Sequence, residues 1–197
     1  LGFVPQGDGL NAYGILTASQ NKELDVVYLM GVDEFNVEAS LGNDTFVIYQ
    51  GHHGDQGAVR ADIVLPGVAY TEKDGLYVNT DGRVQMAKKA VSAPGEARED
   101  WKIIRALSEK VGKALPYDSL HQLRARMVKE FAQFGKIGDV VKADWKAFGK
   151  AGEVRKHPFH SPIDNYYMTN SISRLSPTMA KCTAEFVTKP QLAEAAE

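Results

Sequence analysis

Three short runs of apolar residues, each followed by a glycine or a turn, constrain the fold of this chain most. They occupy residues 24–30, 45–49 and 61–65, and the last one stops at Pro66-Gly67. Nearly continuous apolar runs of this length are typical of strands buried on both faces of a parallel sheet. The intervening segments are long enough for short crossover helices. The sequence therefore predicts an α/β fold with a small, mostly parallel sheet and flanking helices.

A β-hairpin is predicted after the third run. Residues 75–79 and 83–86 flank Thr80, Asp81 and Gly82. Asp-Gly favours a hairpin turn because glycine adopts a positive φ without strain. We expect this hairpin to lie beside the parallel sheet.

Two amphipathic helices are predicted in the middle of the chain. The first follows Pro94-Gly95, ends near Gly112, and buries the apolar residues Trp101, Ile104, Leu107 and Val111. Glu99 and Asp100 precede it and are interpreted as favourable charges at its N-terminus. The second begins at Ser119, which forms a capping box with Gln122. Its inward face comprises Leu120, Leu123, Met127 and Phe131.

The sequence predicts three parts in all. Residues 1–134 form the α/β domain, residues 135–162 an irregular excursion, and residues 163–197 a helical C-terminal tail. Within the tail, Ser176 and Pro177 are suited to the cap and first position of a final helix. Past Pro190 we expect a frayed end.

Composition excludes several classes of protein. The single cysteine, Cys182, cannot close an intramolecular disulfide or supply the roughly four ligands of an iron–sulfur cluster; we interpret it as a small buried apolar side chain. A net charge of -2 argues against a nucleic-acid partner. No apolar run approaches the roughly 18 to 20 residues that span a membrane, so no direct membrane insertion is expected. The chain begins at Leu1 rather than Met, and we expect a fragment of a longer polypeptide.

The best local candidate for a binding site is the sequence Gly-His-His-Gly-Asp at residues 51–55. It follows the second predicted strand, at the edge where parallel sheets bind ligands. Adjacent histidines on a strand end, His52 and His53, point to opposite sides, and no cysteine or third histidine has a metal-site spacing. We therefore predict no metal, with both imidazoles bonded to backbone groups and Asp55 capping the next helix.

No catalytic residue is predicted. The chain has no GxGxxG, phosphate-loop or GxSxG motif, and Cys182 has no histidine near it in sequence. Arg83, together with Asn79, is the one basic residue in a position to bind an anion; the alternative is a solvent-exposed hairpin arginine. The weak, vestigial candidates for cofactor binding are thus His52, His53, Asn79 and Arg83.

Several sequence blocks resemble known proteins. Residues 61–67 (ADIVLPG), 72–75 (EKDG) and 79–85 (NTDGRVQ) are similar to molybdopterin oxidoreductases. Further blocks narrow the resemblance to the large, 75-kDa-type iron–sulfur subunit of respiratory complex I: GHHGD at 51–55, AREDWKIIRALSE at 97–109, LPYD at 115–118, YMTNSISR at 167–174 and TMAKC at 178–182.

This resemblance implies that the chain is part of a multi-subunit redox enzyme. The full subunit of that family carries 2Fe-2S and 4Fe-4S clusters in its amino-terminal half, and this chain resembles the carboxyl-terminal part, which keeps the scaffold without molybdenum or pterin. None of the family's cluster ligands maps onto these residues, so no cofactor is expected here. The resemblance implies other peripheral-arm subunits of complex I as partners. It also implies the cytoplasmic face of a bacterial inner membrane or the matrix face of a mitochondrial one.

Three hypotheses follow. The first is a structural and assembly portion of NADH:quinone oxidoreductase, supporting electron transfer coupled to proton translocation in the whole complex. The second is a fragment of a true, formate dehydrogenase-like molybdopterin enzyme, in which residues 79–85 would approach the cofactor. The third is an isolated binding module that uses His52 and His53.

Overall fold

The chain divides into two compact units. A computed structural model describes residues 8–32, 35–140, 142, 151–153, 158, 161 and 163–189. The units are Leu1–Lys142, called here the sheet unit, and Ala143–Glu197, called the C-terminal unit. The three-part division expected from the sequence stays a prediction, since much of residues 135–162 lies outside the described residues.

The sheet unit is built on three parallel strands. They are β1 (Val26–Met30), β2 (Phe46–Gly51) and β3 (Ile63–Pro66), arranged in that order. Val27 is paired with Val47, and Ile48 with Ile63. The crossovers contain α2 (Val37–Ser40) and α3 (Gln56–Arg60). The predicted parallel sheet with short crossover helices is confirmed.

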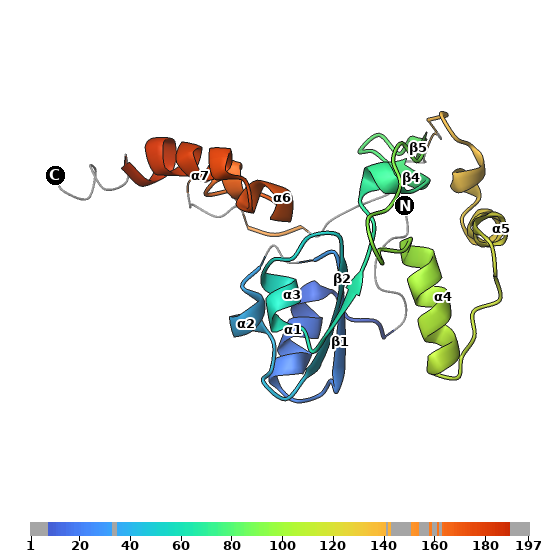
Figure 1. Cartoon of the computed structure of the whole chain (residues 1–197), viewed down its shortest axis with the longest axis horizontal. Coiled ribbons are helices and arrows are strands. Elements are labelled where there is room, and N and C mark those ends of the chain that lie inside the picture. The colour runs from blue at the N-terminus through green and yellow to red at the C-terminus, as the bar shows by residue number, and fades with distance from the viewer. Residues whose placement is uncertain are drawn as a thin grey trace. The chain divides into compact units, whose positions relative to one another are not determined.

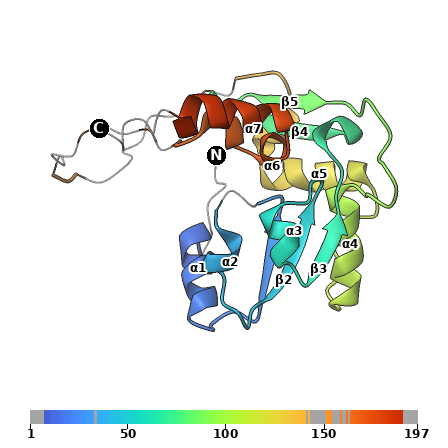
Figure 2. The ribbon, with the colours of Figure 1, turned by 60° about the vertical axis from the view of Figure 1, so that its left-hand side comes forward.

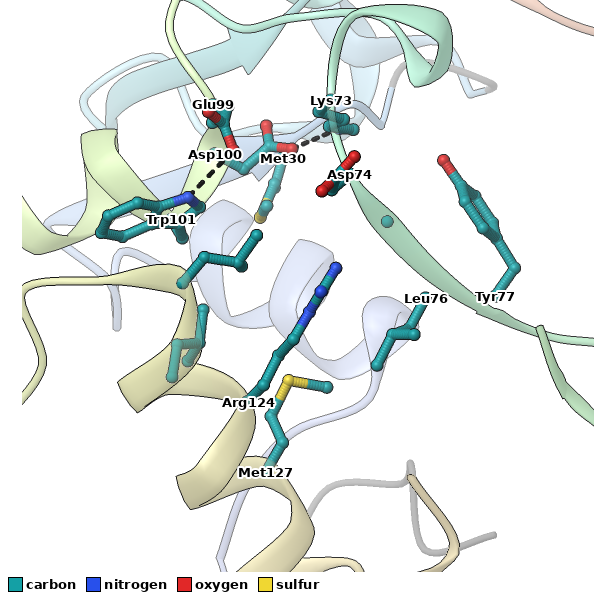
Figure 3. A pocket seen from close by; sticks show the side chains of 13 residues that line it. Met30, Lys73, Asp74, Leu76, Tyr77, Glu99, Asp100, Trp101, Arg124 and Met127 are labelled. Atoms are coloured by element: carbon teal, nitrogen blue, oxygen red, sulfur yellow. Dashed lines mark hydrogen bonds and ion pairs between the residues drawn. The ribbon is translucent and has the colours of Figure 1, made fainter. Parts of the chain in front are cut away.

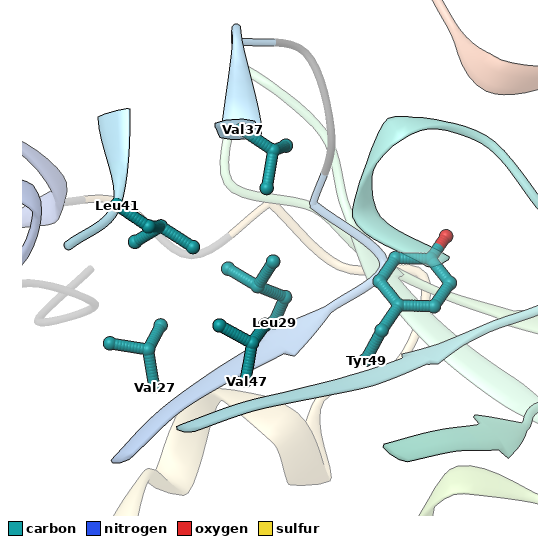
Figure 4. Packing of buried hydrophobic residues seen from close by; sticks show 6 residues of the cluster. All are labelled: Val27, Leu29, Val37, Leu41, Val47 and Tyr49. Atoms are coloured by element: carbon teal, nitrogen blue, oxygen red, sulfur yellow. The ribbon is translucent and has the colours of Figure 1, made fainter. Parts of the chain in front are cut away.

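One face of the sheet carries the hydrophobic core. Helices α1 (Ala12–Gln20), α2 and α3 lie over the same face (Figures 1 and 2). Polar caps begin two of them: the side chain of Asn11 accepts a hydrogen bond from the N–H of Gly14, and that of Asn36 from the N–H of Ala39. The buried cluster, shown in Figure 4, consists of Val27, Leu29, Val37, Leu41, Val47 and Tyr49.

The opposite face of the sheet is only partly covered. Val26, Met30 and Phe46 are 52%, 46% and 42% exposed, whereas their strand neighbours Val27 and Val47 are buried. The prediction of strands buried on both faces is therefore wrong for the described residues. Successive side chains of a strand point to opposite faces, and α1, α2 and α3 all cover the same one.

The predicted hairpin is confirmed. It consists of β4 (Gly75–Val78) and β5 (Val84–Ala87), which are antiparallel, and it follows the short 3-10 helix η1 (Tyr70–Glu72). Gly82 has a φ of +82°, and its N–H donates to the carbonyl of Asn79. This positive φ explains why glycine ends the turn.

Both predicted helices form, although they are less buried than their spacing indicated. Helix α4 spans Asp100–Lys110 and α5 spans Leu120–Glu130, followed by the 3-10 helix η2 (Ala132–Gly135). Val111 is 65% exposed, so its prediction as a core residue is wrong: it caps the end of α4 before Gly112, whose φ is +74°.

Only half of the predicted capping box of α5 is present. The hydroxyl of Ser119 accepts a hydrogen bond from the N–H of Gln122 at 3.2 Å. The side-chain oxygen of Gln122 accepts from the N–H of Asp118 instead of that of Ser119. The reciprocal bond is thus shifted by one residue, and it fixes the chain just before the helix.

The C-terminal unit is helical where it is described. It contains the 3-10 helix η3 (Tyr166–Met168), α6 (Ser171–Arg174), α7 (Pro177–Thr183) and a π-helical turn, η4 (Ala184–Thr188). Ser176 caps α7 and Pro177 takes its first position, as predicted. Cys182 is partly exposed rather than buried, because it lies on the seven-residue helix α7, which has no buried residue. The predicted frayed end past Pro190 lies outside the described residues.

Candidate functional site

His52 and His53 follow β2 at the carboxyl edge of the sheet, as the sequence predicts. Their ring centroids are 5.2 Å apart and the rings meet edge to face at 79°. The predicted opposite orientation is wrong, because the backbone leaves the extended conformation after Gly51 and side-chain alternation ends there. Within the described ranges, no group of three or more His, Cys, Asp or Glu side chains is placed to hold a metal ion.

The loop of residues 51–55, called here the histidine loop, is bonded to Tyr49 through its backbone. The hydroxyl of Tyr49 donates to the carbonyl of His53 at 3.0 Å. Nδ1 of His53 is buried and has no hydrogen-bond partner among the described residues, so the predicted imidazole-to-backbone bond is not formed at that atom. Asp55 does take the N-cap position of α3, but its side chain makes no capping hydrogen bond.

Burial lowers the pKa of His52 below its ordinary value. The neighbouring His53 and the ammonium group of Lys73 lower it further, while Glu72 and Asp100 oppose the shift. The imidazole of His52 therefore favours its neutral form.

A buried polar network, which the sequence did not predict, lies at the same edge. Gln50 is 1% exposed. Its side-chain oxygen accepts from the hydroxyl of Tyr28, and its Nε2 donates to Oδ1 of Asp100 at 2.7 Å. The other carboxylate oxygen of Asp100 forms an ion pair with Lys73. This Gln50 network joins β1, β2, the start of α4 and the segment before β4.

The side chains of this network, together with Gly67, occupy the carboxyl edge of the sheet. The N–H of Gly67 donates to the carbonyl of Gly51 at 2.8 Å, and a Cβ at Gly67 would lie 3.3 Å from Oδ1 of Asp100. Burial, reinforced by the charge of Asp100, raises the pKa of Tyr28 and keeps its hydroxyl protonated.

The residues at this edge do not fit the phosphate of a molybdopterin. Such a group needs free N–H donors or cations. Here the ammonium group of Lys73 is already paired with Asp100, and the buried amide of Gln50 donates to the same carboxylate. The carboxylate of Asp100 would repel a phosphate placed beside it.

Asn79 and Arg83 are held by the hairpin turn itself. The N–H of Arg83 donates to the side chains of Asn79 and Asp81, at 3.0 and 3.2 Å. Nη1 of Arg83 donates to the carbonyl of Gly138 at 2.7 Å, and the N–H of Gly138 returns a bond to Val84. Arg83 is therefore not fully solvent-exposed, and its guanidinium group has a bonding partner. With the bridge between Val84 and Ile137, its bond to Gly138 connects residues 137 and 138 to β5.

A pocket of about 420 Å³ lies between α4, α5 and β4, and Figure 3 shows its lining. Its walls include Met30, Leu76, Leu123, Met127 and Trp101, together with five charged side chains. From the sequence, the apolar stripe of α5 is interpreted as core. The structure shows that three of its members, Leu120, Leu123 and Met127, border this opening.

Comparison with known proteins gives two family matches along the chain. The model described as molybdopterin oxidoreductase matches residues 4–110. The model for the C-terminal region of the NADH-ubiquinone oxidoreductase G subunit matches residues 132–182. The resemblance stated from the sequence blocks is confirmed by both.

Curated relatives agree with these matches. The mitochondrial NADH-ubiquinone oxidoreductase 78 kDa subunit of Neurospora crassa is 49% identical over 80% of this chain and 22% of its own length. The 75 kDa subunit of Reclinomonas americana is 46% identical over 82% of this chain and 24% of its own. The mitochondrial NADH dehydrogenase [ubiquinone] iron-sulfur protein 1 of Solanum tuberosum is 40% identical over 91% and 27%. The chain thus spans about a quarter of the length of these relatives.

No helix in the described part of the chain is long and apolar enough to cross a bilayer.

Proposed function

The chain belongs to the molybdopterin oxidoreductase family, and we propose that it is a structural and assembly portion of the large iron–sulfur subunit of NADH:quinone oxidoreductase. In this role it braces the subunit and holds no redox centre of its own. The 2Fe-2S and 4Fe-4S clusters expected for such a subunit would lie in the remainder of a longer polypeptide. Electron transfer from NADH to quinone, coupled to proton translocation, would be the work of the whole complex.

One observation carries this proposal: two family matches follow each other on the same chain. The molybdopterin oxidoreductase match ends at residue 110, and the NADH-ubiquinone oxidoreductase match begins at residue 132. A molybdopterin enzyme accounts for the first match alone. A complex I subunit accounts for both, and for the names of the relatives.

The Gln50 network supports a bracing role. Tyr28, Gln50, Lys73 and Asp100 come from four separate segments and are bonded to one another at the edge where an α/β domain would otherwise take a ligand. Such a network fixes the relative positions of these segments. A scaffold that carries no cofactor can use this edge for rigidity instead.

Partners and location follow as part of the same proposal. The partners would be other peripheral-arm subunits of complex I. The location would be the cytoplasmic face of a bacterial inner membrane or the matrix face of the mitochondrial inner membrane.

The proposal is tested in the full-length subunit, in cells that assemble the complex. Replacing Gln50 by Leu should lower the amount of assembled complex on a native gel, with the NADH:quinone rate per assembled complex unchanged. Replacing His52, His53, Asn79 and Arg83 by Ala, singly, should leave that rate and the iron–sulfur electron paramagnetic resonance signals within about twofold. A loss of the signals per assembled complex would overturn the non-redox role.

A true molybdopterin enzyme is the second candidate, favoured by the match over residues 4–110. Inductively coupled plasma mass spectrometry of the purified chain separates the two candidates. Substoichiometric molybdenum, tungsten, iron and zinc support the structural role. Stoichiometric molybdenum or tungsten would replace it with the enzyme, and stoichiometric zinc would point to a site at His52 and His53.

A further inference from the structure

We propose that the pocket between α4, α5 and β4 binds a small monocarboxylic acid with an apolar body, and that the guanidinium group of Arg124 holds its carboxylate. This inference is independent of the proposed function, because it concerns a site that the family matches do not describe and that is separate from the histidine loop. It is carried by the charges, the burial and the lining of the pocket.

Two of the three carboxylates that line the pocket are bonded to lysines and to Trp101. Asp100 is paired with Lys73. Glu99 accepts from Nζ of Lys102 and from Nε1 of Trp101. Burial of Glu99 acts to raise its pKa, but these two bonds and the charges of Lys102 and Lys89 together bring the pKa below its usual value. Glu99 therefore stays charged, and both side chains have partners of their own.

Asp74, the third of these carboxylates, is satisfied from outside the pocket. Oδ1 accepts from the backbone N–H of Lys89 at 2.8 Å, and Oδ2 lies 3.9 Å from Nζ of Lys88. The bond from Lys89 is the main cause of the lowered pKa of Asp74. The charges of Lys88, Arg124 and Lys89 also lower it, so the carboxylate stays charged at neutral pH.

Arg124 is the pocket cation that has an N–H group without a hydrogen-bond acceptor in the described part of the chain. Its Nη2 is buried and has no hydrogen-bond partner among the described residues. Figure 3 shows its side chain reaching from α5 into the pocket, with Leu76 and Met127 beside it. A guanidinium group is always charged and carries five donors in a planar fork that matches a carboxylate. A shielded donor without an acceptor is costly, and a bound carboxylate would remove that cost.

The remaining residues that line the pocket suit the apolar body of the proposed acid. Leu76, Leu120, Leu123, Met127 and Trp101 border the opening. A volume of about 420 Å³ lies in the range of small-molecule sites. The nearby charges of Asp74, Asp100 and Glu99 disfavour a multiply charged ligand such as a phosphate dianion, so a single negative charge fits best.

Isothermal titration calorimetry of the full chain with octanoate tests the proposal, with 1-octanol as the uncharged probe of the same body. Octanoate should bind with one site per chain, and 1-octanol roughly tenfold more weakly or worse. Arg124→Gln should weaken octanoate by roughly tenfold and leave 1-octanol unchanged. Arg126→Gln is the matched control, because Arg126 lies on the same helix and pairs with Glu130 at the surface; it should change neither.

A second pair of variants separates ligand binding from a structural role of Arg124. Arg124→Lys keeps the charge but loses the fork, so octanoate should bind more weakly than to the native chain and more tightly than to Arg124→Gln. Asp74→Asn removes a like charge near the ligand and should strengthen octanoate binding. Equal binding of octanoate and 1-octanol, or weaker octanoate binding in Asp74→Asn, would overturn the proposal.

Discussion

At the scale of single residues, Gln50 is the side chain whose replacement should cost the chain most. Gln50→Leu keeps the volume but leaves the hydroxyl of Tyr28 and the carboxylate of Asp100 each without a bond that the structure gives them. We expect a loss of about 2 to 3 kcal/mol in the free energy of unfolding, measured by urea titration. Gln85→Leu, at an exposed position of β5, is the control and should change it by less than about 0.5 kcal/mol.

His52 gives stability a dependence on pH. Because its pKa is lowered in the folded chain, the unfolded chain binds a proton more readily between the two pKa values. Well above pH 6.5, the ordinary pKa of histidine, His52 is neutral in both states and does not affect stability. As the pH falls through 6.5 toward the pKa of folded His52, protonation of the unfolded chain lowers the stability of the fold. An NMR titration of the His52 ring should show a midpoint below 6.5. His52→Gln should flatten the fall in thermal midpoint between about pH 7 and pH 5.5. A ring midpoint at or above the ordinary value would contradict this.

Part of the candidate site could be predicted from the sequence. The position of His52 and His53 after a strand follows from the strand's apolar run and from the geometry of parallel sheets. The Gln50 network could not be predicted, because Asp100 is far from Gln50 in the sequence and looks like a charged residue at the start of a helix. One signal was available: a polar side chain directly after the apolar run of β2, which must find a partner if it is buried.

At the scale of elements, the central strand should be the least tolerant of change. Val47 is fully buried in β2, and its side chain belongs to the core cluster. Val47→Ala should lower the free energy of unfolding by about 2 kcal/mol, through lost burial and the cavity left behind. Val59→Ala on α3, where the valine is 87% exposed, is the matched control. Equal effects of the two substitutions would mean that the core does not lie on this face of the sheet.

The strands themselves were predictable, but their surroundings were not. Alternating positions of β1 and β2 are equally apolar, so Val26 and Phe46 look the same in sequence as the buried Val27 and Val47. Which face the helices cover depends on the direction of the crossovers, which no residue of the strands records. Helix α1 was not predicted either, and its one local signal was Asn11, a favourable N-cap.

At the scale of the whole molecule, the sheet unit should fold without the C-terminal unit. The core cluster, the Gln50 network and the lining of the α4–α5 pocket all lie before Lys142. Since stability depends mainly on burial within one core, a chain ending at Lys142 should keep a cooperative thermal transition, with a midpoint within about 4 °C of that of the full chain.

A chain ending at Val111 provides the contrast. It keeps the three strands and α4 but loses α5, whose Leu123 and Met127 form one wall of the pocket. Its midpoint should be clearly lower, and Trp101 should become more exposed in its fluorescence spectrum, because the residues that line the pocket with it are gone. If instead the chain ending at Lys142 lost its cooperative transition, the C-terminal unit would be required for folding, and the bracing role would belong to both units together.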